Sequence, residues 1–221
     1  MNETETSDTI LDAAEELFAK QGFAATTTKQ IGSAAGVNPA LIHYYFGNKE
    51  GLYRALLRRL FESIIAKGAQ QLASSPPPDV AVRALVGVQS ETMVAHPSFP
   101  RLLARELVDH GMAHAGEHVA RLSDTLFRRL CELIRGGQEA GMFRRDMDPR
   151  FAAVSVISLV PYFHIARPVV GILLDSGPDG LDEATMRAYG RHAAEFALAA
   201  LAALAARPDP PTTTDTPESG P

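Results

Sequence analysis

GFAATTTKQIGSAAGVNPALIHYYFGNKEGL, residues 22–52, is the most informative stretch of the chain. It predicts two short helices joined by the turn AAGVN, in which Gly36 takes the left-handed backbone that glycine adopts most readily. Gly32 leaves room for the second helix to cross the first closely, and Ile42 falls at an inward position of that second helix. A small residue, a glycine four positions later and an apolar residue after it are typical of a helix-turn-helix.

The starts of the two short helices carry capping residues. Thr27 caps the first helix, and Gln30 three positions later completes a capping box. Asn38 is a good N-cap for the second helix, and Pro39 stands at the helix start, where proline is favoured. Capped N-termini offer free N–H groups and a positive dipole end to phosphates. Because the second helix of a helix-turn-helix lies in the major groove of DNA, these ends would face the DNA backbone.

We therefore expect a surface rich in phosphate contacts and poor in hydrogen bonds to bases. Lys29 and Lys49 would supply positive charge, and Tyr44 a hydroxyl group. His43 is the polar side chain expected to read a base or a phosphate, and the small apolar residues before it would contact base edges. The candidate DNA-binding residues are Thr27, Thr28, Lys29, Asn38, Pro39, Ala40, Leu41, His43, Tyr44 and Lys49.

The charge distribution agrees with this surface. Residues 20–60 carry six Lys and Arg side chains against the single acid Glu50, whereas residues 1–19 carry six acids and no Lys or Arg. The net charge of the whole chain is -5, so the basic excess is confined to the region of the motif. Such a local footprint favours nucleic-acid binding. We expect Arg58 and Arg59 to be solvated, because a run of arginines on a helix usually is.

The whole chain of 221 residues reads as helical, since apolar residues recur at helical spacing. Its 46% hydrophobic and 21% charged residues are typical of a soluble globular protein. A single cysteine forms no internal disulfide, and the acidic N-terminus does not resemble a secretory signal, so we expect a cytoplasmic protein. The motifs of serine hydrolases, zinc proteases and phosphate-binding loops are missing, so the sequence predicts no enzyme activity and no cofactor.

Proline and glycine divide the chain into segments. The predicted fold class is all-α, with an N-terminal three-helix helix-turn-helix domain followed by a larger helical domain. The predicted boundaries are a disordered N-terminus over 1–6, the helix-turn-helix domain over 7–52, the larger domain over 53–206 and a disordered proline-rich tail over 207–221.

Within the larger domain, two apolar segments affect the predicted function. We expect one helix over 118–139 and a buried or interfacial helix over 151–174, kinked at Pro161. The second segment is long enough to span a bilayer, but its His164 and Arg167 would be costly in lipid.

Residues 26–52 follow the run T-T-x-x-x-I-G-x-A-A-G-V-N-x-x-x-I-H-Y-Y-F-G-N-K-E-G-L, and over 7–60 the chain resembles the N-terminal domain of the TetR family of bacterial transcriptional regulators. Two positions depart from the pattern of the family. Gly32 stands where alanine is usual, which weakens the helix by about 1 kcal/mol. His43 stands where tyrosine is usual, which would make DNA binding sensitive to pH.

The resemblance implies a ligand-responsive DNA-binding transcriptional regulator. It implies a repressor that binds a palindromic operator as a homodimer and is released by a small, mostly apolar molecule. A transcriptional activator or a co-ligand-dependent regulator of the same fold is an alternative, and a helical protein-binding adaptor is a more distant one. We expect the dimer to form through the helices over 151–174 and 191–206, with Ala193, Ala197 and Ala200 allowing close approach.

The effector would bind within the larger domain. The inward faces of its middle helices give the candidate ligand-binding residues Met93, Phe99, Leu103, Arg105, Glu106, Leu107, Phe127, Phe163 and His164. The same residue types also line any protein core, so the alternative that a residue belongs to the packed core stays open for each of them.

No metal site is predicted. His110, His114 and His118 are four residues apart and would share one face of an unbroken helix. Gly111 and Gly116 interrupt that helix, so we expect a polar loop instead.

Overall fold

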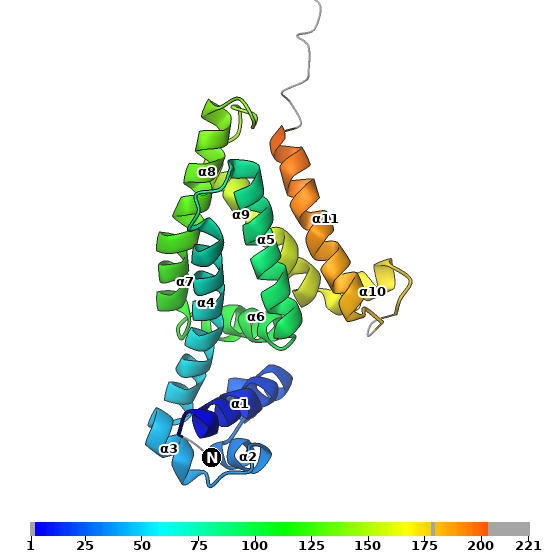
Figure 1. Cartoon of the computed structure of the whole chain (residues 1–221). Helices are drawn as coiled ribbons and strands as arrows, with labels where there is room; N and C mark the ends of the chain where they lie inside the picture. The colour runs from blue at the N-terminus through cyan, green and yellow to red at the C-terminus, as the bar shows by residue number, and fades with distance from the viewer. Residues whose placement is uncertain (1–2, 178–179, 203–221) are drawn as a thin grey trace, which may run out of the picture.

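The computed structural model describes residues 3–177 and 180–202, and all regular elements in these ranges are helices (Figure 1). The all-α prediction is thus confirmed. In chain order they are α1 (Glu3–Ala25), α2 (Thr28–Ala34), α3 (Ala40–Phe46), α4 (Lys49–Leu72), α5 (Pro78–Ala95), α6 (Phe99–His110), α7 (Gly116–Leu122), a π-helical turn (Ser123–Phe127), α8 (Arg128–Glu139), α9 (Pro149–Ile165), α10 (Arg167–Leu173) and α11 (Glu183–Ala202).

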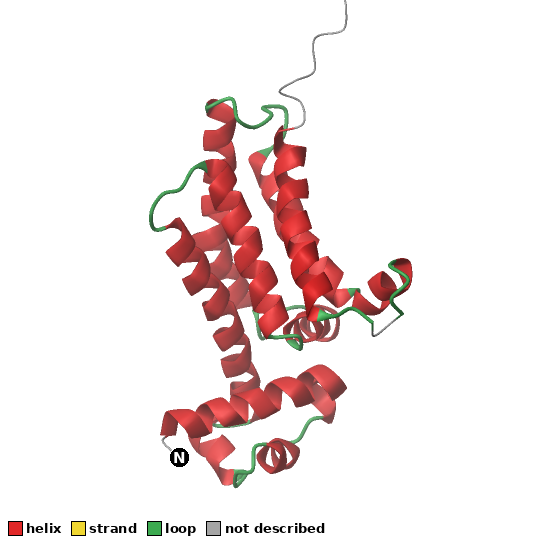
Figure 2. Cartoon of the chain, turned by 45° about the vertical axis from the view of Figure 1, so that its right-hand side comes forward, coloured by secondary structure: helices red, strands yellow, loops and turns green. Residues whose placement is uncertain are grey.

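The N-terminal domain is the smaller lobe at the bottom of Figure 2, built from α1, α2, α3 and the first turns of α4. Helices α2 and α3 have seven residues each, too few to be stable alone in water. They are held by an apolar core in which the side chains are at most 1% exposed: Phe18, Ile31, Ile42, Leu52 and Tyr53. Burial of these side chains therefore fixes the two short helices on α1 and α4.

Helix α4 runs from this lobe into the larger domain, where α5 is the central helix (Figure 1). Helix α5 packs against α4, α8, α9 and α11. A Cβ on Gly190 of α11 would lie 2.0 Å from Oγ of Ser90 in α5, so the glycine permits a close approach of the two helices. One continuous hydrophobic core extends from the small lobe through this packing, which couples the two domains mechanically.

Two of the three alanines predicted at the dimer interface, Ala193 and Ala197 of α11, face this core, whereas Ala200 is exposed. Ala193 and Ala197 are 1% and 4% exposed. This corrects their predicted place at a dimer interface, because their helix face is already covered by the chain's own core.

One predicted boundary changes, at the N-terminus. Helix α1 begins at Glu3, so residues 3–6 are helical and not disordered as predicted. The regular part of α1 is interrupted at Gly22, where φ is +84°. Helix α11 is described as far as Ala202, and the rest of the predicted domain over 203–206 and the predicted tail over 207–221 lie outside the described residues.

Two predicted long helices are broken. The segment over 118–139 contains a π-helical turn at Ser123–Phe127, which separates α7 from α8. The segment over 151–174 continues through Pro161 as α9 and breaks at Ala166, just before the Arg167-Pro168 pair that opens α10. A proline restricts the residue before it and is tolerated in a first helical turn, which explains the break at this point.

Among the described residues, no single helix combines the length and hydropathy of a membrane span. Only α9 and α10 taken together do so, and they are bent by 84° relative to each other.

Candidate DNA-binding surface and ligand cavity

The crossing of α2 and α3 has the geometry that the sequence predicts. A Cβ on Gly32 would lie 3.0 Å from Cγ of Pro39 and 3.0 Å from the carbonyl oxygen of Val37. Gly36, in the turn, has a φ of +67°. The small residue is therefore required by the close approach, and the second glycine by the left-handed backbone.

Capping groups begin both helices. The Thr27 side chain accepts a hydrogen bond from the Gln30 backbone N–H at 3.2 Å, and the Gln30 side chain accepts one from the Thr27 backbone at 2.8 Å, which confirms the capping box. The Asn38 side chain accepts from the backbone N–H of Ala40 at 2.9 Å. Pro39 occupies the N-cap position, so α3 begins one residue later than predicted.

Most of the predicted DNA-contacting side chains lie on the surface of the small lobe. Tyr44 is 71% exposed and packs edge-on against the ring of Tyr45. Nδ1 of His43 lies 3.0 Å from the carbonyl oxygen of Gly47. Thr27, Lys29, Asn38, Ala40, His43 and Tyr44 are exposed, while Thr28, Pro39 and Leu41 are half-buried. The start of α2 and the exposed face of α3 thus offer polar groups to a partner without rearrangement.

Lys49 has a different environment from the predicted one. Its Nζ donates to the carbonyl oxygens of Phe23 at 2.8 Å, Thr26 at 2.9 Å and Ala24 at 3.4 Å. It also lies 4.4 Å from the centroid of the Phe23 ring. These contacts use all three donors of the ammonium group and tie the start of α4 to the end of α1. They support an internal role for Lys49 in place of the predicted phosphate contact.

Lys49→Met is expected to lower the stability of the small lobe by about 1.5 kcal/mol, because hydrogen bonds from a charged donor are lost. Lys29→Met is the matched control, since Lys29 is exposed. It is expected to leave the melting temperature unchanged and to weaken DNA binding with a shallower salt dependence. Thermal unfolding and DNA titrations at several salt concentrations separate the two lysines. An unchanged melting temperature in Lys49→Met would contradict the internal role.

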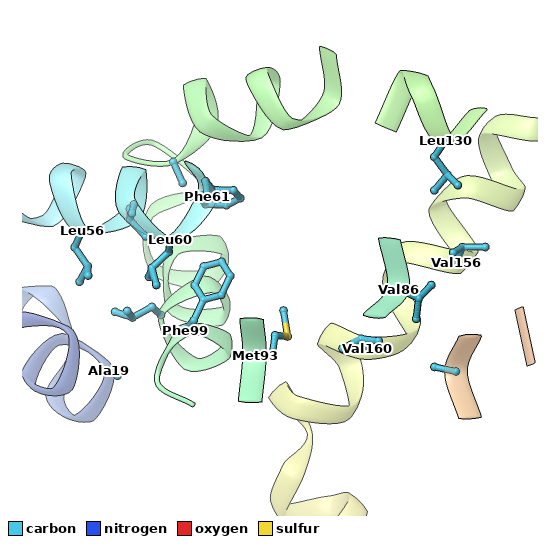
Figure 3. Close-up of a cluster of buried hydrophobic side chains, with 14 of the residues drawn as sticks. Ala19, Leu56, Leu60, Phe61, Val86, Met93, Phe99, Leu130, Val156 and Val160 are labelled. Atoms are coloured by element: carbon cyan, nitrogen blue, oxygen red, sulfur yellow. The ribbon is translucent and has the colours of Figure 1, made fainter. Parts of the chain in front are cut away.

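An apolar cavity of about 250 Å³ lies inside the larger domain. Figure 3 shows five of the lining residues in the core, with Phe61 and Phe99 on one side of the view and Val86, Val156 and Leu130 on the other. The full lining is Phe61, Ile64, Leu85, Val86, Val88, Gln89, Met93, Phe99, Leu103, Val119, Leu122, Leu126, Phe127, Leu130, Val156, Ile157 and Pro161. The amide of Gln89 donates to the Ile157 carbonyl oxygen at 3.1 Å, so the one polar side chain in this lining is already partnered. Such a cavity suits a small, uncharged, apolar molecule.

Four of the predicted ligand-binding residues line this cavity: Met93, Phe99, Leu103 and Phe127. Three others on α6 do not. Leu107 is 61% exposed, and the guanidinium group of Arg105 donates to the carbonyl oxygens of Ala19 and Lys20 on α1. Glu106 is fully buried, but it bonds to the backbone N–H of His114 and not to the cavity. Only one face of α6 borders the cavity, and these residues lie on its other faces.

The two predicted residues on α9 also lie outside the cavity. Phe163 stacks on Tyr189 of α11, with ring centroids 3.8 Å apart, in a second hydrophobic cluster. His164 is buried beside it, and desolvation, with the positive charge of Arg167, lowers the pKa of its imidazole. Both residues fall near the end of α9, beyond the segment of that helix that reaches the cavity.

Apart from Met93 on α5, sequence reasoning missed the cavity residues on α4, α5 and α9, such as Phe61, Val86 and Val156. Their spacing identifies them as inward-facing apolar residues, but it does not distinguish a cavity wall from a packed core. Pro161 also lines the cavity. The sequence predicted a kink in α9 at this proline, but it did not predict a contact with a ligand.

Cys131 is buried in α8, and burial raises the pKa of its thiol. A buried, protonated thiol is poorly reactive, so this side chain serves as a small apolar packing group.

Together, the helix-turn-helix, its exposed polar face and the helical domain behind it define a class of DNA-binding regulators. Comparison with known proteins identifies the family. The profile of the bacterial regulatory proteins of the tetR family matches residues 10–56, and that of the tetracyclin repressor-like C-terminal domain matches residues 78–196. The chain belongs to the TetR family, and is accordingly a DNA-binding transcriptional regulator.

Individual relatives agree with this assignment. The chain is 32% identical over 170 residues to the HTH-type transcriptional repressor NicS of Pseudomonas putida, covering 76% of this chain and 80% of NicS. The fatty acid degradation regulator FadR of Bacillus halodurans has a similar fold, with a TM-score of 0.69 at 21% identity, over 89% of this chain and 96% of FadR. The transcriptional regulator FadR of Bacillus subtilis, in complex with stearoyl-CoA, has a TM-score of 0.67 at 16% identity, over 87% and 97% of the two chains.

Proposed function

We propose that this protein is a homodimeric repressor whose affinity for a palindromic operator falls when a small apolar molecule enters the cavity of the larger domain. The cavity itself carries the proposal. It is bordered by α4, the helix whose first residues hold the small lobe in place, through Phe61 and Ile64. A ligand between α4, α5 and α9 would change the position of α4, and with it the spacing of the two recognition helices in a dimer.

Exposed apolar side chains on α9, α10 and α11 support the homodimer. Phe151, Tyr162 and Phe196 are 73%, 65% and 56% exposed. Phe196 borders a shallow apolar groove shared with Ser155 and Leu159 of α9. Large apolar groups gathered on one side of a monomer are typical of a protein–protein interface. The proposed interface residues are Phe151, Val154, Tyr162, Ile165, Val169, Ile172, Leu173 and Phe196.

The class of ligand follows from the cavity lining. No charged side chain lines it, which disfavours an ion buried there. The complex of Bacillus subtilis FadR with stearoyl-CoA shows that a protein of this fold binds an acyl thioester. Only the acyl chain of such a thioester suits the apolar cavity, and the charged coenzyme A group would stay outside it, so saturated acyl-CoA thioesters of increasing chain length are suitable first probes.

The experiment begins with selection of binding sites from a random duplex library by the full-length protein. Enrichment of an inverted repeat is expected, as is a dimeric mass in solution. The selected duplex is then titrated with protein in the presence of each thioester. Enrichment of a single half-site without symmetry, or a monomeric protein–DNA complex, would contradict the dimeric repressor.

Val119→Trp tests the role of the cavity. Val119 lines the cavity and is 38% exposed, so a larger side chain there would narrow the entrance with little effect on the core. We expect unchanged operator affinity and at least a tenfold higher concentration of an active thioester for release. Val108→Trp is the matched control, because Val108 is 81% exposed on α6 and lies outside the cavity lining. If the same thioester concentration releases both variants from the operator, the effector binds outside this cavity.

A further inference from the structure

Glu106 is a buried carboxylate at the contact between the two domains. It is 0% exposed, and it lies on α6, which packs against α1. Its Oε1 accepts from the backbone N–H of His114 at 2.7 Å, and its Oε2 lies 3.2 Å from Nδ1 of the same histidine. Among the ion pairs of the described residues, none joins Glu106 to a lysine or an arginine. A buried negative charge without a permanent positive partner is costly, so the site calls for a cation.

The backbone at the end of α6 gathers the groups around this carboxylate. Helix α6 ends at His110, and Gly111 and Met112 both have positive φ angles, of 55° and 68°. The Met112 N–H donates to the carbonyl oxygen of Glu106 at 3.1 Å, which closes the reversal. The chain therefore reverses its direction, and the reversal brings His114 into contact with Glu106. Sequence spacing had grouped His110 and His114 with His118, whose ring instead stacks beside Phe61.

We propose that Glu106, His110 and His114 form a binding site for a divalent transition-metal ion of the zinc type. One ligand atom from each residue lies within 4.8 Å of the other two. Two imidazole nitrogens and one carboxylate oxygen form a known zinc ligand set, with water as the fourth ligand. Binding requires the three ligand atoms to move closer together, to about 2.0–2.2 Å from the ion. The ion would supply the positive charge that the buried carboxylate lacks.

The surroundings of the three groups suit a metal ion. The His110 and His114 rings are 4.8 Å apart and nearly perpendicular, and the Phe23 ring contacts both, at 5.7 and 5.4 Å. The ring of Tyr53 lies 5.3 Å from that of His114. An apolar aromatic shell around metal ligands limits the access of solvent to the site.

The position of the site gives it a consequence for the whole molecule. Phe23 belongs to α1 and Tyr53 to α4, whereas the three ligands come from α6 and the turn after it. A bound ion would stiffen the contact between the small lobe and the larger domain. An effect on operator affinity would rest on the proposed function, whereas metal binding itself does not.

The test uses the full-length, untagged protein, freed of metal with a chelator and titrated with Zn²⁺ by calorimetry and with Co²⁺ by visible absorption. We expect one ion per chain, a rise in melting temperature with Zn²⁺, and Co²⁺ bands of a low-symmetry site with nitrogen and oxygen ligands. His110→Gln, which removes one ligand at a half-buried position, is expected to weaken binding at least tenfold. His192→Gln, on an exposed position of α11, is the matched control and is expected to bind as the wild type does.

Glu106→Gln provides a second variant that keeps the shape of the side chain. Its binding should also fall, provided that its circular dichroism shows a folded protein. Absence of saturable binding by the wild type, or equal binding by His110→Gln and His192→Gln, would overturn the proposed site. Because operator DNA is not used, these results are independent of the repressor proposal.

Discussion

Tyr44→Phe is expected to weaken operator binding about a hundredfold without loss of stability. The Tyr44 side chain is 71% exposed on α3, so its hydroxyl is free to donate to a DNA phosphate. A hydrogen bond to a charged group contributes about 1.5 kcal/mol, and the proposed dimer contains two copies, which together give about 3 kcal/mol. Fluorescence anisotropy with the selected duplex measures the change.

The control for this substitution is Thr125→Val, which removes the hydroxyl of an exposed threonine in the π-helical turn before α8, outside the proposed DNA-binding surface and dimer interface. It should leave DNA affinity unchanged. The dependence of affinity on salt should be the same for Tyr44→Phe as for the wild type, because no charge is removed. A wild-type affinity in Tyr44→Phe would show that the ring contacts DNA without its hydroxyl, or that α3 is not the contacting helix.

Gly137→Ala is expected to destabilise the larger domain by about 2–3 kcal/mol. The new Cβ would lie 2.2 Å from Cδ2 and 2.6 Å from Cε2 of the Phe143 ring. That ring is 4% exposed and is therefore held on all sides. The backbone N–H groups of Met142 and Phe143 also bond to the Gly137 carbonyl oxygen, at 2.8 and 3.0 Å, so the segment cannot easily move away. The melting temperature should fall by roughly 5–10 °C.

The neighbouring Gly136 offers a control of opposite sign. A Cβ at this position has no atom within 4 Å, and the residue lies inside α8. Gly136→Ala should therefore stabilise the helix by about 1 kcal/mol. Both melting temperatures are measured by differential scanning calorimetry at one protein concentration, since dimerisation makes them concentration-dependent. Similar melting temperatures for the two variants would contradict the packing of Phe143 on α8.

The helix-turn-helix could be read from the sequence because its determinants are local. The close crossing of α2 and α3 requires a small residue at Gly32, and the left-handed turn requires a glycine at Gly36. Thr27 and Gln30 form a capping box and are only three residues apart. These requirements depend on backbone geometry within one short segment, so residue types at fixed spacing reveal them. The exposure of Lys29 and Tyr44 agrees with the predicted surface.

Lys49 shows where local reasoning stops. A lysine at the start of a helix near a basic motif is expected at a phosphate, yet its ammonium group binds carbonyl oxygens more than twenty residues earlier in the chain. The partners are brought together by the packing of α1 on α4, which no spacing rule describes. The break at Ala166 is different, because the adjacent Arg167-Pro168 pair is a local signal for it.

The sequence by itself determined the all-α fold, the position of the helix-turn-helix and the apolar character of the larger domain, since propensity, capping and periodicity act over a few residues. Only the tertiary structure decided which apolar residues border a cavity and which fill the core. It also decided that Glu106 meets His110 and His114 and not His118. The reason is physical: a void and a cluster of ligands depend on relative positions of helices, and these are settled by long-range packing of many side chains at once.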